Sequence, residues 1–138
     1  MAGFRIVTKI AAPIELCFNL ARDIDFHTRS LAHTEERAVA GRTTGLIGLN
    51  ESVTWEARHF GIRQRLTTLI TELNYPHHFR DVMTSGAFHA FAHYHRFRIQ
   101  QGVTLMIDEV VFQSLPSLPG RLVDALFMTR HLPHPRNP

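Results

Sequence analysis

The sequence predicts a single α+β domain in which one face of a seven-stranded antiparallel sheet is covered by a C-terminal helix. Extended runs with a two-residue hydrophobic period follow one another, separated by short turns, and consecutive hairpins build an antiparallel sheet. Two short helical segments follow the first of these runs. After Pro116 and Pro119 the period changes from 2 to 3.6, which indicates a helix. When one face of a sheet lies in water, its other face must be covered by another element. This terminal helix is the only predicted element long enough to cover it.

The N-terminal part predicts one strand and two short helices. Residues 4–10 alternate between apolar and polar side chains, a strand pattern that Ala12 and Pro13 end. Pro13 suits the first turn of a helix, where its missing N–H costs nothing. Apolar residues then recur at helical spacing through residue 21: Ile14, Cys17, Phe18 and Ala21. Asp23 is a good N-cap for a second short helix that ends near residue 30.

The middle of the chain predicts six further strands. Their expected bounds are residues 35–40, 51–60, 62–73, 79–84, 87–99 and 103–113. Gly61 predicts a tight hairpin, Ser85 and Gly86 a second turn, and Gln100 to Gly102 a third. Because side chains alternate between the two faces of a strand, we expect Trp55, His59 and Gln64 to face the interior.

The run 87–99 carries an unusual set of side chains. One face of it collects His89, Phe91, His93, His95, Phe97 and Ile99. The opposite face ends in two arginines that favour water, so the imidazoles and aromatics are expected to face inward. Pairing about the last turn with Ile99 opposite Thr104 would place His95 across from Asp108. The preceding strand would bring Asp81 beside His89.

The last strand and the terminal helix complete the fold. The final strand is apolar on both faces, so the alternation of its side chains does not by itself show which face is turned inward. The side chains placed inward are Thr104, Met106, Asp108, Val110 and Phe112. Leu118, Leu122 and Leu126 define the apolar stripe of the helix over about residues 119–132. Prolines from residue 133 onward forbid regular helix in the tail.

Composition excludes several classes of protein. The 138 residues suit one domain, with no internal boundary. The net charge of +3 comes from basic residues that are scattered along the sequence, so no nucleic-acid partner is expected. No apolar run could span a bilayer and no signal peptide opens the chain, which predicts a cytoplasmic protein with no membrane span. Cys17 is expected to be a buried, inert thiol. No nucleotide, phosphate or nucleophile motif is present, and no cofactor is expected.

Several local strings resemble the START-like or SRPBCC superfamily, which has the helix-grip fold and includes polyketide cyclase/dehydrase and lipid-transport proteins. The strings are those at 11–15, 51–61, 86–88, 93–97, 106–108 and 120–124, within a match over about residues 3–130. They are most similar to a small bacterial, ligand-binding branch sometimes labelled "cell-division inhibitor-like". The resemblance implies that the sheet curves around the terminal helix and leaves a cavity for an apolar or amphipathic ligand.

Two departures from the family pattern stand out. Asn50 occupies a position where related sequences often have glycine, and asparagine tolerates the left-handed turn needed there. The terminal helix is a turn or more shorter than usual, so the cavity mouth is either less covered or covered by a partner subunit. A homodimer is therefore a possible assembly.

The residues expected to line the cavity combine apolar and polar side chains. They are Trp55, His59, Gln64, Phe91, His93, His95, Met106, Asp108, Leu122 and Leu126. Convergent polar groups in an apolar concavity are typical of a ligand site. Three interpretations of the polar group stay open: a structural network, a floor that orients a ligand's polar end, or an acid/base pair of His95 and Asp108.

Binding of a small hydrophobic or amphipathic molecule without catalysis is the expected function. A polyketide cyclase/dehydrase-like enzyme is the first alternative, and a regulator that acts through its surface is the second. His93 and His95 have the same-face spacing of zinc ligands, but two histidines are too few and no metal is expected. Protonation of these histidines should reduce ligand uptake through about pH 6.5.

Overall fold

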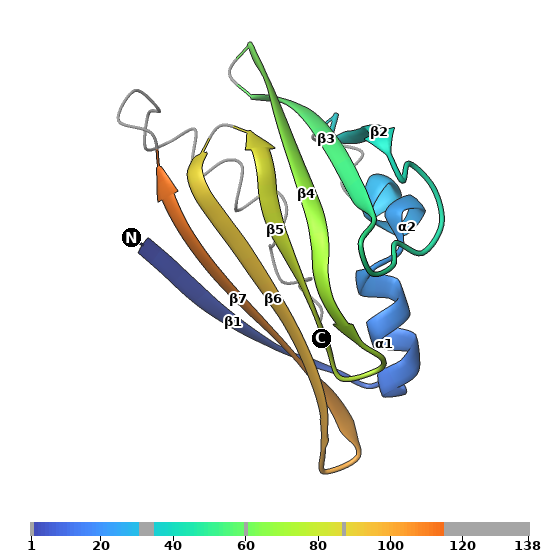
Figure 1. Cartoon of the computed structure of the whole chain (residues 1–138). Coiled ribbons are helices and arrows are strands. Elements are labelled where there is room, and N and C mark those ends of the chain that lie inside the picture. The colour runs from blue at the N-terminus through green and yellow to red at the C-terminus, as the bar shows by residue number, and fades with distance from the viewer. Residues whose placement is uncertain (1, 31–34, 60, 87, 115–138) are drawn as a thin grey trace.

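The computed structural model describes residues 2–30, 35–59, 61–86 and 88–114, and these residues form one seven-stranded antiparallel sheet with two helices (Figure 1). The strands are β1 (Ala2–Ile10), β2 (Arg37–Gly41), β3 (Ser52–His59), β4 (Ile62–Asn74), β5 (His78–Gly86), β6 (Phe88–Gln100) and β7 (Val103–Ser114). Helices α1 (Ile14–Ala21) and α2 (Ile24–Ser30) connect β1 to β2. The strand order is β1-β7-β6-β5-β4-β3-β2. The predicted α+β class, the seven strands and the two early helices are confirmed. The predicted terminal helix lies outside the described residues.

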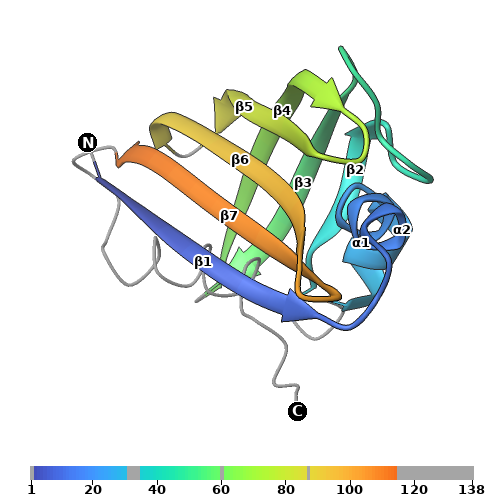
Figure 2. The ribbon, with the colours of Figure 1, turned by 90° about the horizontal axis from the view of Figure 1, so that it is seen from below.

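The sheet is bent, and both described helices lie at one end of its concave side (Figure 2). Helix α1 contacts β6 and β7, while α2 contacts β2. We call the face turned toward α1 the inner face and the opposite one the outer face. Every strand therefore sends alternate side chains to an apolar interior and to the outside of the sheet.

The two helices begin where the sequence indicates. Pro13 precedes α1, and Glu15 in its first turn interacts favourably with the positive end of the helix dipole. The carboxylate of Asp23 accepts a hydrogen bond from the backbone N–H of Phe26 at 3.1 Å, which is the capping contact expected at the start of α2. Cys17 is buried, and its burial raises the pKa of the thiol. Both helix predictions are confirmed.

Phe18 joins α1 to the sheet. Its side chain has no exposed surface, and its ring meets the rings of Tyr75, Phe79 and Phe97 edge-on at centroid distances of 5.2 to 5.3 Å. Edge-to-face contacts of this kind add to the free energy of burying the rings. A second apolar cluster lies further along the inner face and consists of Leu66, Phe88, Phe91 and Val110.

The hairpin of β6 and β7 has the predicted register, with Ile99 opposite Thr104 and His95 opposite Asp108. Two expectations about β6 were wrong. Ile99 is 65% exposed, because β5 stops pairing with β6 at Arg96 and the hairpin extends beyond it. A register shift between Phe88 and Ala90 buries Phe88 and leaves His89 exposed.

Asp81 is also not where it was expected. It pairs with His93 and not with His89. Ser85 and Gly86, the predicted turn, belong to β5, so the turn into β6 lies later in the chain and the partner of Asp81 moves from His89 to His93. On β7, Thr104, Asp108 and Val110 face inward as predicted and are buried.

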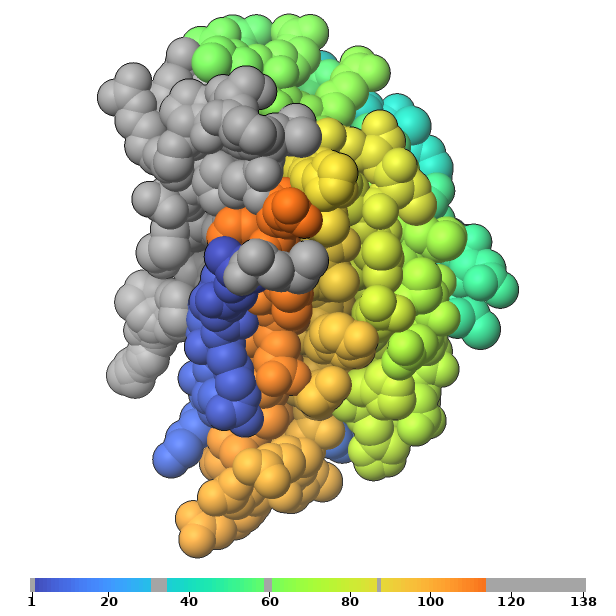
Figure 3. Space-filling model, turned by 60° about the vertical axis from the view of Figure 1, so that its left-hand side comes forward, coloured from blue at the N-terminus to red at the C-terminus, as the bar shows by residue number. Residues whose placement is uncertain are grey.

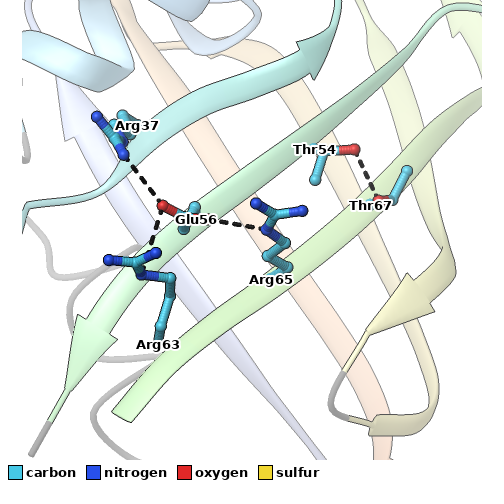
Figure 4. Close-up of polar contacts among 6 residues, drawn as sticks. All are labelled: Arg37, Thr54, Glu56, Arg63, Arg65 and Thr67. Atoms are coloured by element: carbon cyan, nitrogen blue, oxygen red, sulfur yellow. Dashed lines mark hydrogen bonds and ion pairs between the residues drawn. The ribbon is translucent and has the colours of Figure 1, made fainter. Parts of the chain in front are cut away.

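The outer face is rich in arginine. Figure 3 shows β1, β7, β6, β5 and β4 side by side on this face, with neither described helix over them. At its β2 to β4 side, the carboxylate of Glu56 accepts hydrogen bonds from Arg65 at 2.8 Å and Arg37 at 3.2 Å, with Arg63 at 3.8 Å (Figure 4). Glu56 is only 5% exposed, and the hydrogen bond from Arg65 contributes most to lowering its pKa.

Candidate functional site

Two histidines and two aspartates meet on the inner face, and we call them the His/Asp cluster. His93 and His95 are two residues apart on β6, so their side chains point to the same face. The antiparallel registers bring Asp81 of β5 and Asp108 of β7 to either flank. The cluster therefore depends on three neighbouring strands and is fixed by the pairing of the sheet.

The contacts within the cluster run diagonally between strands. His93 Nε2 is 2.9 Å from Asp108 Oδ1, and His95 Nε2 is 2.9 Å from Asp81 Oδ2. His95 Nδ1 lies 3.3 Å from the same Asp108 oxygen that His93 contacts. Asp108 thus contacts both imidazoles, while Asp81 contacts that of His95.

The rings of the cluster form a stack. His93 and His95 lie with ring centroids 3.6 Å apart and an interplanar angle of 20°. Phe79 covers the other side of His95 at 4.0 Å and 12°. Packing on both sides leaves the His95 ring few alternative orientations, so its two nitrogens stay aimed at the two carboxylates.

His95 is held in its charged form. Burial by itself lowers the pKa of His95, but hydrogen bonds to Asp108 and Asp81 and the charges of both carboxylates outweigh it and raise the pKa to about 9. At neutral pH both ring nitrogens therefore carry protons and donate to carboxylates.

The pKa values of His93 and Asp108 are both lowered, in contrast to the raised pKa of His95. Burial and the positive charge of His95 lower the pKa of His93, so its imidazole is neutral at pH 7 and donates Nε2–H to Asp108. Burial favours a protonated Asp108, but hydrogen bonds from both histidines hold the pKa of this carboxyl well below its usual range. One charged and one neutral imidazole thus share an ionised carboxylate.

The cluster borders a small pocket of about 40 Å³ on the inner face. The pocket is lined by Ala21, Arg22, Ile24, His27, Ile47, Val53, Trp55, Thr68, Ile70, Phe79, Asp81, His93 and His95. This volume suits a few water molecules or one small polar group, whereas pockets for whole drug-sized molecules measure roughly 300 to 1,000 Å³.

Asp81, His93 and His95 are close enough to be considered as metal ligands, since one donor atom from each lies within 4.8 Å of the others. An imidazole nitrogen binds an ion in the plane of its ring. Two rings stacked 3.6 Å apart and tilted by 20° have planes that converge only far from either nitrogen. In this arrangement the two histidines cannot direct their lone pairs at one ion.

Five of the residues predicted from the sequence take different places around the cluster. Trp55 is 4% exposed and lines the pocket together with His93 and His95. Asp108 is buried beside both imidazoles but is not among the lining residues. Phe91 belongs to the second apolar cluster.

The remaining predicted residues are more distant or undescribed. Met106 is partly buried against the core formed with Phe18, and Gln64 is half-buried opposite Ala57 near the start of β4. Neither lines the described pocket. The side chain of His59 and the residues Leu122 and Leu126 lie outside what the structure describes.

Sequence reasoning placed Asp81 beside His89 without counting it among the site residues, and it did not single out Phe79 or Thr68. Phe79 and Asp81 have the inward parity of a strand, which was a usable signal. The register between β5 and β6 was predicted wrongly, because β5 continues through the residues predicted as a turn, Ser85 and Gly86. Thr68 has the same strand parity as Gln64, but a single threonine gave no reason to place it near histidines.

Comparison with solved structures shows the fold. The chain is similar to a START superfamily protein from Mycobacterium smegmatis, with a TM-score of 0.66, 12% identity and coverage of 90% of this chain and 85% of that one. It is similar to the protein TTHA0849 from Thermus thermophilus, with a TM-score of 0.69, 20% identity and coverage of 92% and 84%. It is also similar to the major latex-like protein 151 of Panax ginseng, with a TM-score of 0.65, 12% identity and coverage of 93% and 91%.

The sequence itself matches no family profile and no curated protein. The likeness therefore establishes the START-like fold, as the local strings indicated. Among the described helices, none combines the length and apolar character needed to cross a membrane.

Proposed function

We propose that this chain, which has the START-like fold, binds a small apolar or amphipathic molecule against the inner face of its sheet, without catalysis. The observation that carries the proposal is the His/Asp cluster, a group of convergent polar side chains at a pocket whose remaining lining is mostly apolar but includes Arg22, His27 and Thr68. A polar group buried in a core costs stability unless it is hydrogen-bonded, and here both imidazoles have carboxylate partners.

The polar and apolar parts of such a ligand would contact different side chains of the site. The pocket of about 40 Å³ accepts only a small polar end. The apolar side chains at the same pocket, Ile24, Ile47, Val53, Trp55 and Ile70, would contact the part of the ligand next to that polar end. Burial of the ligand's hydrophobic surface is the main source of affinity for such a molecule.

An acid/base enzyme is the second candidate, and the neutral state of His93 favours it. The sequence suggested His95 and Asp108 as the reacting pair. His95 is protonated between two carboxylates and is therefore a poor base at neutral pH. His93 is the imidazole able to accept a proton. Turnover of a polyketide-like carbonyl compound by the wild type, lost in His93→Gln, would favour the enzyme over the binding protein.

Uptake of a neutral apolar fluorophore tests the binding proposal. We expect saturable fluorescence enhancement with the wild type and energy transfer from Trp55, which lines the pocket. Ala21→Trp places a large side chain at the pocket wall and should block uptake. Val111→Trp adds the same side chain on the outer face and should not. Absence of saturable uptake by the wild type, or equal uptake by both variants, would contradict the proposal.

A further inference from the structure

We propose that a basic groove on the outer face of the sheet binds small soluble phosphomonoesters. The groove has a volume of about 420 Å³ and lies where β5 begins to pair with β6. It is lined by Arg5, His77, His78, Arg96, Phe97, Arg98, Ile107 and Glu109. This second site lies on the face opposite the His/Asp cluster, so the inference goes beyond the proposed function and does not depend on it.

The strand registers place three arginines around this groove. Arg96 and Arg98 are two residues apart on β6, so both side chains point to the outer face. Arg5 belongs to β1, and β7 lies between β1 and β6 (Figure 3). Ile107 of β7 lies opposite Arg96 and is only 7% exposed. Neighbouring strands are about 4.8 Å apart, so the long arginine side chains reach over the same strip of β7 from either side.

Most guanidinium donors at the groove have no acceptor among the described residues. A guanidinium carries five N–H donors. That of Arg98 is exposed and makes no hydrogen bond or ion pair within the described part of the chain. Arg96 donates from Nη1 to Glu109 Oε1 at 2.8 Å, whereas Arg5 Nε is 3.9 Å from Glu109 Oε2, beyond hydrogen-bond distance. Donors are therefore available from both sides of the groove.

The charge of the groove suits a dianion. Its three arginines and Glu109 give a formal charge of +2. Lys9 adds a further positive charge beside it, because Lys9 and Arg98 both lie opposite Leu105. The nearby carboxylate of Glu72 is already paired with Arg80 at 3.6 Å. A phosphomonoester has a charge near −2 at about pH 7.5, and its oxygens match the planar fork of an arginine.

The shape of the groove favours a small molecule over a lipid surface. The pairing of β5 with β6 ends at Arg96, but β6 continues to Gln100. His77, before β5, and Arg98, on the continuing part of β6, both border the groove. The groove is therefore a recess beside the start of β5, which a single phosphate-bearing molecule can enter and the flat plane of a bilayer cannot. Ile107 gives the organic part of such a molecule an apolar contact.

Titration with three aromatic anions tests the inference. Phenyl phosphate, phenyl sulfate and benzoate would be added at about pH 7.5 and about 0.15 M salt, while NMR follows the side-chain Nε–H signals of the arginines. We expect saturable changes at Arg96 and Arg98 with phenyl phosphate, with a dissociation constant of about 1 mM or lower. The two monoanions should bind at least roughly tenfold more weakly, because each forms fewer charge-assisted hydrogen bonds.

Two variants of the groove have opposite expected effects. Arg98→Gln removes the unpaired guanidinium and should weaken phenyl phosphate binding about tenfold. Glu109→Gln removes the competing carboxylate from Arg96 and should strengthen binding severalfold, a gain that loss of the fold cannot produce. Arg58→Gln is the matched control: it makes the same change of charge as Arg98→Gln at an exposed outer-face position on β3 and should leave binding unchanged.

Four outcomes would overturn the inference. The first is the absence of saturable changes at the arginines, and the second is an equal loss of binding in Arg58→Gln, which would mean that long-range charge is sufficient. The third is a change confined to Trp55, which would place the anion in the inner-face pocket. The fourth is binding to vesicles of phosphatidylcholine and phosphatidylglycerol in equal amounts but not to phenyl phosphate, which would assign the groove to a membrane surface. Each of these outcomes leaves the proposed function in place, because fluorophore uptake is measured on the opposite face.

Discussion

The ionisation of His95 is strongly coupled to the fold. Its imidazolium is buried, stacked between Phe79 and His93, and paired with two carboxylates. Such a charge is tolerated in a core only while its partners remain in place. The same residue is therefore a structural element of the sheet and part of the site, which explains why the sequence left both interpretations open.

The pKa shifts predict how the stability of the protein depends on pH. The pKa of His95 is raised from 6.5 to about 9 in the folded state. The contribution of this residue to the free energy of unfolding is therefore complete below about pH 6.5 and is lost as the pH rises through 9. That contribution is on the order of 3 kcal/mol. His93 acts in the other direction: its pKa is lowered, so stability falls as pH drops below 6.5 and the unfolded chain takes up the proton.

Thermal unfolding from pH 5 to 10 measures this dependence. We expect a maximum near pH 6.5 to 7 and a marked loss of the unfolding temperature between pH 7 and 9. His95→Gln should have a flatter alkaline limb. An unchanged alkaline limb in that variant would show that His95 is not protonated in the fold. The pH dependence of ligand uptake stays a prediction, and its midpoint is expected away from pH 6.5 because the pKa of His95 is raised and that of His93 is lowered.

At the scale of elements, α1 packs on the sheet through three buried side chains, Ile14, Cys17 and Phe18, of which Phe18 is the largest. Phe18→Ala removes a fully buried side chain and its three edge contacts, and should destabilise the fold by about 3 to 5 kcal/mol. Leu16→Ala lies on the same helix at a position that is 50% exposed and should change stability by only about 0.5 kcal/mol. Urea unfolding of both variants checks this. Similar losses in the two would mean that α1 does not pack as described.

The arginine group around Glu56 links β2, β3 and β4 on the outer face. Glu56→Gln leaves Arg37, Arg63 and Arg65 facing one another without a carboxylate between them. We expect this variant to be less stable than the wild type, with part of the loss recovered in about 0.5 M salt because salt screens the repulsion. Glu72→Gln, at an exposed pair with Arg80, is the control and should show little change. A loss that salt does not reduce would point to packing instead of charge.

Most elements were predictable because local signals agree with the fold. Pro13, Asp23 and Gly61 marked boundaries through backbone chemistry that acts within a few residues. The pairing of His95 with Asp108 was also readable, since a short turn fixes the register of β6 and β7. The place of Asp81 was predicted wrongly, because Ser85 and Gly86 have the composition of a turn but continue β5, which moves the pairing with β6 by four residues. The stacking of the two imidazoles depends on packing from Phe79, which no spacing rule encodes.

At the scale of the whole molecule, the described part is an open sheet. Its inner face is mostly apolar and carries the His/Asp cluster, and its outer face is basic. Edge strands β1 and β2 end the sheet on either side. The possible homodimer stays a prediction, and light scattering at micromolar concentration would distinguish it from a monomer of 15.8 kDa. The account as a whole depends on a ligand reaching the His/Asp cluster.

The most direct test follows the ring nitrogens of His93 and His95 by nitrogen-15 NMR while the neutral apolar fluorophore of the uptake experiment is added. The account predicts that both rings and the Trp55 indole change with the dissociation constant found by fluorescence, because all three border the pocket. Variants His93→Gln and His95→Gln assign the two rings. Saturable binding that leaves both ring signals unchanged, with changes confined to the outer face, would contradict the account.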